Sequence, residues 1–248
     1  YRAANVRGAV TMKNTSVVLL ADLAVGLAGF AEAAKPKKRT RNANRVGPYA
    51  VGFVGQTTYT SDATEDEELA ADILLSIGPD AVQNLSVSTE DSDIGYQAAF
   101  GFRFNRYLPT ELSPVQLGET VSTARADMDF GTGLLPSKAE LSFTVGGPLV
   151  SIVGILPVND RLEFFARAGY LFSSSKREVQ LRVDGDNAGF GSAKGDSQDV
   201  VYGAGAAFHF GQVYSLRLEY LQLDDLGDAR RSGNEDANMI GLGLVVRF

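Results

Sequence analysis

The chain has 248 residues, of which 44% are hydrophobic and 21% charged, a composition that excludes a disordered protein. It contains no cysteine, which excludes disulfides, thiolate metal sites and thiol nucleophiles. The net charge of −7 and the isoelectric point near 4.8 argue against nucleic acid as a partner. No run of 18 or more apolar residues is present, so a membrane-spanning helix is not expected.

The first 33 residues are predicted to be upstream residues followed by a secretory signal peptide. A short basic start at Met12-Lys13 precedes a mostly apolar run from Ser16 to Phe30, and Ala31-Glu32-Ala33 matches a cleavage pattern of small residues. Residues 34–46 are basic and would form a periplasmic amino-terminal segment. The alternatives are a helix lying on a membrane surface and a disordered basic arm.

From residue 47 to residue 248, eight segments alternate large apolar residues with small or charged ones. The last segment ends the chain with apolar residues at every second position, namely Leu242, Leu244, Val246 and Phe248. A strand directs successive side chains to opposite faces, so this spacing of two predicts β-strands with one apolar face. Twelve aromatic residues are predicted to lie on that face: Tyr49, Phe53, Tyr59, Tyr96, Phe100, Phe102, Phe104, Tyr170, Tyr202, Phe208, Tyr214 and Tyr220.

The connections between these segments alternate in length. Residues 108–114, 157–160 and 211–213 form short connections, whereas residues 61–93, 124–138, 173–199 and 224–237 form long polar ones. This alternation is typical of a membrane β-barrel with both termini in the periplasm and long loops outside the cell. Within the first long loop, Glu68 to Ile77 could form an amphipathic helix.

Alternation alone does not say which face points outward, and a soluble barrel with an apolar interior is the alternative. The small face carries glycines such as Gly101, Gly205 and Gly243, which suit the crowded interior of an eight-stranded barrel better than a solvated surface. The sequence therefore predicts an all-β fold, an eight-stranded antiparallel up-and-down transmembrane β-barrel over residues 47–248.

These segments resemble a known family. The resemblance lies in residues 154–162, residues 165–170, residues 201–206, residues 215–220 and the carboxyl-terminal residues 241–248. Together they resemble the small eight-stranded outer-membrane barrels related to the OmpA transmembrane domain, over about residues 47–248. The resemblance implies a location in a Gram-negative-type outer membrane, contact with lipid and lipopolysaccharide, and recognition of the carboxyl-terminal strand by the barrel assembly machinery.

The charged residues on the small face are the candidate site. Buried charges must be paired, so we expect a charge network that plugs the lumen, made of Arg103, Glu163, Arg167, Arg217 and Glu219. The same residues would equally serve as interior packing. His209, the single histidine, lies near a short turn, and no Gly-x-Ser-x-Gly motif accompanies it, so no catalytic residue is assigned.

Carboxylates gather in residues 61–93, which contain no lysine or arginine, and again in residues 224–237. No calcium-loop spacing is present, so a solvated anionic rim is predicted and no metal or cofactor is assigned. The sequence predicts a non-enzymatic envelope protein with a structural role. The alternatives are a narrow gated pore for ions or small solutes, and an adhesin that acts through residues 61–93 and 173–199.

Overall fold

The computed structural model describes residues 46–60, 63–78, 80–90, 92–129, 131, 133–226 and 235–248. All of them fall in one compact unit, residues 40–248. The signal peptide and almost all of the basic segment predicted from the sequence lie outside the described residues. The elements, in chain order, are β1 (Gly47–Thr60), α2 (Ala63–Leu75), β2 (Val82–Glu90), β3 (Ser92–Arg103), β4 (Pro109–Asp129), β5 (Leu134–Pro157), β6 (Leu162–Val183), β7 (Asp186–Phe210), β8 (Tyr214–Leu226) and β9 (Glu235–Arg247).

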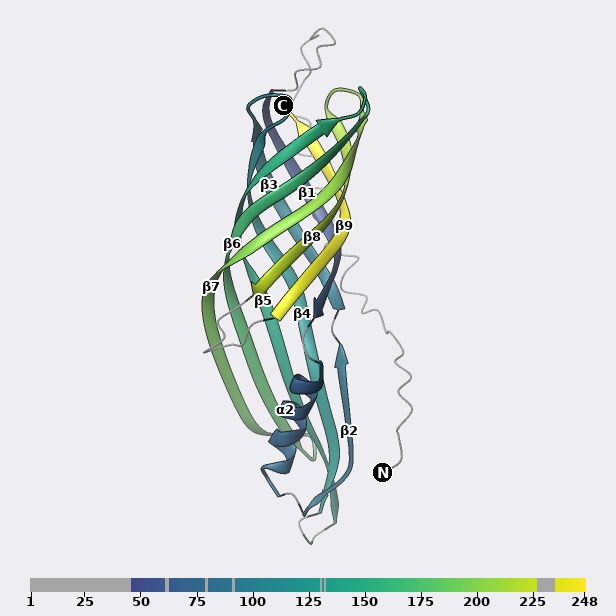
Figure 1. Cartoon of the computed structure of the whole chain (residues 1–248). Helices are drawn as coiled ribbons and strands as arrows, with labels where there is room; N and C mark the ends of the chain where they lie inside the picture. The colour runs from purple at the N-terminus through teal and green to yellow at the C-terminus, as the bar shows by residue number, and fades with distance from the viewer. Residues whose placement is uncertain are drawn as a thin grey trace. The chain divides into compact units, whose positions relative to one another are not determined.

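Eight of the strands close into a barrel (Figure 1). The sheet runs β4-β3-β1-β9-β8-β7-β6-β5, and β5 pairs again with β4, so the ring is complete. Every pairing is antiparallel. The predicted eight-stranded antiparallel barrel is therefore confirmed. β2 stands outside the ring and pairs only with β4, alongside the part of β4 that extends past β3.

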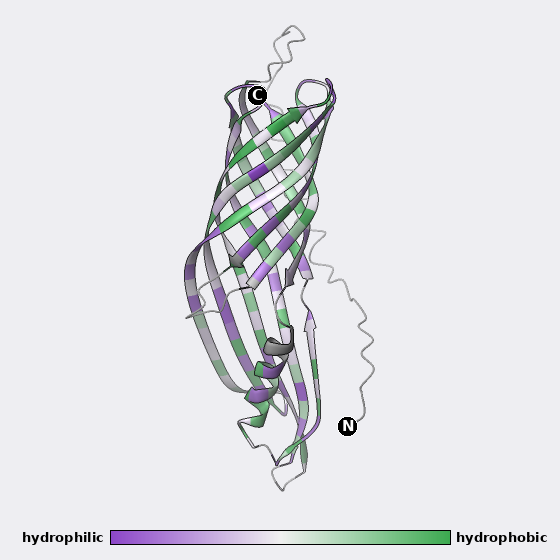
Figure 2. Cartoon of the chain, viewed as in Figure 1, coloured by the Kyte–Doolittle hydropathy of each residue, from purple (hydrophilic) through white to green (hydrophobic). Residues whose placement is uncertain are grey.

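Apolar side chains on the outer face of the closed barrel are exposed, and their neighbours along each strand are buried. On β6, Phe164 and Tyr170 are exposed whereas Phe165 and Leu171 are buried. The hydropathy view agrees, since apolar residues alternate along the strands of the closed barrel and hydrophilic residues become more frequent beyond it (Figure 2). Nine of the twelve aromatic residues in the candidate set lie on this outer face: Tyr96, Phe100, Phe102, Phe104, Tyr170, Tyr202, Phe208, Tyr214 and Tyr220.

The aromatic residues of β1 were predicted to face outward, and this prediction was wrong. Tyr49, Phe53 and Tyr59 are 7%, 1% and 2% exposed and point into the barrel. Two of these rings lie over a glycine on a neighbouring strand, because Tyr49 pairs with Gly101 and Phe53 with Gly243. A Cβ at Gly101 would lie 2.2 Å from the Tyr49 ring, so the glycine makes room for the aromatic side chain. The glycines opposite Tyr49 and Phe53 therefore make room for these two rings inside the barrel.

The carboxyl-terminal strand departs from its predicted pattern at one position. Leu242, Leu244 and Phe248 are exposed, but Val246 is only 1% exposed, between its cross-strand partners Ala50 and Tyr214. Alternation places Val246 on the outer face; it does not by itself make the side chain accessible.

Two of the predicted long loops are mostly strand. β4 and β5 run through residues 124–138 and leave only residues 130–133 as a connection, and β6 and β7 leave only Asp184-Gly185. Both of these turn residues have positive φ, 51° and 84°, as a two-residue hairpin turn requires. The β7 residues before Val201 pair with β6 alone, so β2, β4, β5, β6 and β7 form an open sheet beyond the ring, which we call the extension.

The helix α2 packs on the extension. Its Ala70 and Leu74 are fully buried in a cluster with Ala124, Ala126 and Met128 of β4 and Ala139 of β5. Leu69 and Ile77, each four residues from Ile73 and so on the same side of a regular helix, are exposed. The small alanine side chains of β4 let the helix backbone approach the sheet closely.

The pairing of β4 with β5 contains one irregularity. A proline inside a strand often marks a bulge, but Pro148 of β5 pairs regularly with Pro114, and the register shifts instead between Gln116 and Glu119 of β4. Gly118 adopts a φ of +86° there, a conformation that glycine tolerates without strain. The shift reverses the facing of β4, so that Leu117 and Thr120 both point inward.

Candidate functional site

The middle of the lumen holds a cluster of two carboxylates, two guanidinium groups and a tyrosine. Glu111 of β4 lies at its centre and forms ion pairs with Arg167 of β6 and, at 2.7 Å, with Arg217 of β8. Tyr49 of β1 donates a hydrogen bond of 2.6 Å to the same carboxylate. Glu219 lies 3.0 Å from Nε of both arginines, and Arg217 donates a hydrogen bond to it from Nη2.

This middle cluster is balanced in charge, and its four charged side chains are at most 5% exposed. Because β4, β6, β8 and β1 stand on different sides of the ring, the contacts cross the lumen. Removing two opposite charges from water is costly, and close ion pairs with additional hydrogen bonds offset that cost. The Arg217 guanidinium also stacks 4.1 Å from the Phe165 ring centre.

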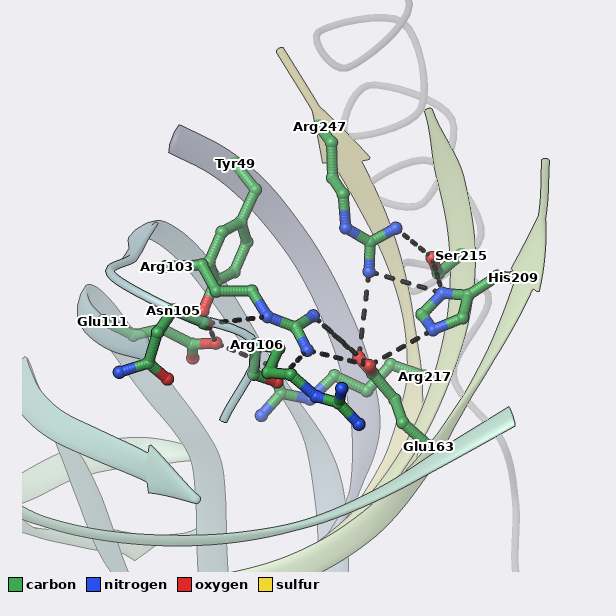
Figure 3. Close-up of polar contacts among 10 residues, drawn as sticks. All are labelled: Tyr49, Arg103, Asn105, Arg106, Glu111, Glu163, His209, Ser215, Arg217 and Arg247. Atoms are coloured by element: carbon green, nitrogen blue, oxygen red, sulfur yellow. Dashed lines mark hydrogen bonds and ion pairs between the residues drawn. The ribbon is translucent and has the colours of Figure 1, made fainter. Parts of the chain in front are cut away.

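A second cluster closes the end of the barrel that carries the short turns 104–108, 158–161 and 211–213, which we call the turn end (Figure 3). Glu163 accepts hydrogen bonds from Arg103, and its carboxylate lies 3.3 Å from His209 Nε2 and 3.8 Å from Arg247 Nη2. Arg103 also donates to the carbonyl oxygens of Asn105 and Arg106, which fixes the first short turn.

The structure thus divides the five predicted network residues between two clusters. Arg103 and Glu163 lie in the turn-end cluster, and Arg167, Arg217 and Glu219 lie in the middle cluster. Sequence reasoning missed Glu111 and Arg247. Glu111 was assigned to the short connection 108–114, which contains Pro109 and Pro114, yet the strand begins at Pro109 and accommodates both prolines. The signal was available in the alternation of Glu111, Ser113 and Val115 with Leu112 and Pro114.

Ser215, His209 and Glu163 form a connected chain that has the residue types of a hydrolytic triad. Ser215 Oγ lies 2.6 Å from His209 Nδ1, and His209 Nε2 faces Glu163. Ser215 is fully buried, however, and Arg247 donates to its oxygen at 2.5 Å. The cavity between the two clusters measures about 30 Å³, room for no more than one or two waters. Ser215 is therefore inaccessible in this arrangement, and its hydroxyl takes part in the hydrogen-bond network of the turn-end cluster.

The acidic segments give no cation site in the part of the chain that the structure describes. No group of three or more metal-ligating side chains gathers among the residues that the structure describes.

In the described part of the chain, no helix has the length and apolar character needed to cross a bilayer.

Taken together, a ring of eight antiparallel strands, an exposed apolar outer face and a lumen filled with paired charges define an integral outer-membrane β-barrel protein. The family described as OmpA-like transmembrane domain matches residues 49–248, and the chain belongs to that family. It localises to the Gram-negative outer membrane.

The individual relatives share at most a quarter of their aligned residues with this chain. Outer membrane protein A of Klebsiella aerogenes is 25% identical over 245 residues, which cover 96% of this chain and 56% of that protein. The chain therefore spans about half the length of this relative. Among solved structures, Neisserial surface protein A is 12% identical with a TM-score of 0.44, covering 82% of this chain and 97% of that one. OprG from Pseudomonas aeruginosa is 13% identical with a TM-score of 0.42, at the same coverages.

Proposed function

We propose that this protein is a sealed structural barrel that strengthens the outer membrane and presents its extension to the outside. The observation that carries the proposal is the filled lumen: Glu111 links β4 to β1, β6 and β8, and the turn-end cluster ties β3, β6, β7 and β9 together. Contacts that cross the lumen brace the ring of strands against deformation.

The proposal includes an orientation. Short turns at one end and long extensions at the other match the usual arrangement, in which the short turns face the periplasm. The carboxyl terminus lies at the turn end, where the Phe248 backbone donates to the Pro48 carbonyl. Protease added to intact cells should cleave only within the extension, and cleavage at residues 104–108 or 158–161 would reverse the assignment.

Planar-bilayer recording tests the sealed state. Purified protein refolded into lipid should give no stable conductance, because the described lumen offers a cavity of only about 30 Å³ between its clusters. Folding is checked on the same sample by a heat-modifiability gel, on which a closed barrel migrates differently before and after boiling. Regular conductance steps from folded protein would favour the alternative, a narrow gated pore.

Adhesion is a second candidate function, and the extension favours it. The first 15 residues of β7, up to Val200, form a strand segment about 50 Å long beyond the pairing with β8. Phe190 in this segment is 61% exposed. Deleting residues 180–190 shortens the hairpin at a paired position and keeps Arg177, whose guanidinium lies over the Phe143 ring in the lumen. Loss of attachment to host cells or to other bacteria by that variant, with unchanged heat modifiability, would assign adhesion to this hairpin.

A further inference from the structure

Beyond the charged clusters, the lumen contains a second barrier made of apolar side chains. The Tyr59 ring of β1 meets the Phe143 ring of β5 edge-on, with ring centres 6.2 Å apart. β1 and β5 are separated by β3 and β4 around the ring, so the two rings meet across the lumen. We define the apolar layer as these rings and the side chains in the same buried cluster that fill the bore, namely Leu117, Leu149, Leu171, Leu221, Leu223 and Met239.

The apolar layer follows the middle cluster along each strand. Leu117 comes six residues after Glu111, Leu171 four residues after Arg167, and Leu221 two residues after Glu219. Each member of the layer is at most 2% exposed. The layer therefore lies on the extension side of the charges, and anything crossing the lumen has to pass both.

We infer that the apolar layer, rather than the ion pairs, is the barrier that keeps ions from crossing this barrel. This inference rests on the proposed function, a sealed barrel. A charged layer can exchange one partner for another: Glu111 already contacts Arg167, Arg217 and Tyr49, and a water-sized cavity adjoins it. The apolar side chains of the layer offer an ion nothing in exchange for its hydration shell, and they exclude water as well. The buried carboxylate of Asp199, paired across from Leu171, already accepts hydrogen bonds from Ser173 and Ser197.

The experiment compares two sets of substitutions in the full chain by planar-bilayer recording. The charge variant, Glu111→Gln with Arg217→Gln, removes one charge of each sign and leaves Arg167 paired with Glu219. The layer variant, Phe143→Ser with Leu171→Ser, replaces two apolar members from β5 and β6. A combined variant carries all four changes. The matched control, Val150→Ser with Phe172→Ser, alters the outer face of the same two strands.

We expect no conductance from the charge variant or the matched control, conductance steps from the layer variant, and larger steps from the combined variant. Every sample is first shown to be folded by its heat-modifiable migration, and Phe143→Ala alone replaces the layer variant if the serine pair does not fold. Conductance steps from the charge variant, or silence from folded layer and combined variants, would overturn the inference. Stable conductance from the unaltered protein would instead overturn the proposed function, so the two failures are distinguishable.

Discussion

The closed barrel and the extension are built from the same long strands, but the outer surface of the barrel suits lipid and that of the extension suits water. In the ring, every strand has two partners, and the outer face carries Phe100, Leu156 and Tyr170, each more than half exposed. In the extension, β2 and the distal half of β7 each have one partner, and the outer face carries exposed pairs such as Lys176 and Glu178. Lipid requires every backbone group to be paired, whereas water tolerates an open sheet edge.

The interiors differ in the same way. The ring is filled by residues that meet across the lumen, first charges and then apolar side chains. In the extension there is no opposite wall to meet, and α2 supplies the missing apolar cover through Ala70 and Leu74. A sheet that does not close needs a second layer to bury its inner face.

The largest expected effect comes from breaking the middle cluster. Glu111→Ala leaves Arg167 and Arg217 without their shared carboxylate inside the barrel, and we expect a loss of about 3–5 kcal/mol in unfolding free energy. Urea unfolding in lipid vesicles, followed by gel migration, measures it. Lys176→Gln breaks an exposed ion pair in the extension and should change the free energy by less than about 1 kcal/mol. Equal losses would contradict the comparison.

The second-largest effect is expected from a charge introduced on the outer face, and it should differ between the ring and the extension. Leu242→Arg places a cation in the lipid-facing band of β9 and should cost about 2–4 kcal/mol, because the charge cannot be hydrated there. Ser142→Arg places the same charge on the outward-facing side of β5 in the extension, where we expect almost no change. The readout is the urea midpoint of folded protein in vesicles. A large loss from Ser142→Arg would place that part of the extension inside the membrane.

Weakening the contact between α2 and the sheet should leave the ring folded. Leu74→Ala removes a fully buried side chain and should weaken the packing of α2 against the sheet by about 2–3 kcal/mol. We expect faster protease cleavage near α2 with unchanged heat modifiability, because the ring does not depend on the helix. The exposed neighbour Leu69 gives the matched control, Leu69→Ala, which should leave cleavage unchanged. Loss of heat modifiability in Leu74→Ala would show that helix and ring fold as one unit.

The smallest effect tests how glycines accommodate interior rings. Gly101→Ala would push a Cβ into the Tyr49 ring and should cost about 1–3 kcal/mol. Gly154, on the outer face of β5, has open space around its Cβ position, with the nearest atom 4.0 Å away. Gly154→Ala should therefore be neutral or slightly stabilising. A neutral Gly101→Ala, measured by the same unfolding assay, would remove the physical explanation for the inward aromatic residues of β1.

Several features could be predicted from the sequence because they depend on local order alone. The spacing of two in segments such as residues 162–172 and 214–220 predicts strands with one apolar face, and the glycines of the other face predict a narrow lumen. The number of strands in the ring followed from these segments. Arg103, Glu163, Arg167, Arg217 and Glu219 could be selected as candidate lumen residues because each stands on the small face of its strand.

The remaining features required the tertiary structure, since they depend on what stands opposite a residue. Tyr49, Phe53 and Tyr59 alternate like lipid-facing residues, and only the glycines across from Tyr49 and Phe53 explain why rings on this strand face inward. Glu111 lies between two prolines in a segment that was predicted as a connection. Its contacts join strands that are far apart in sequence. Alternation along one strand determines that two faces exist, but only pairing with other strands decides which side chains meet inside the closed ring.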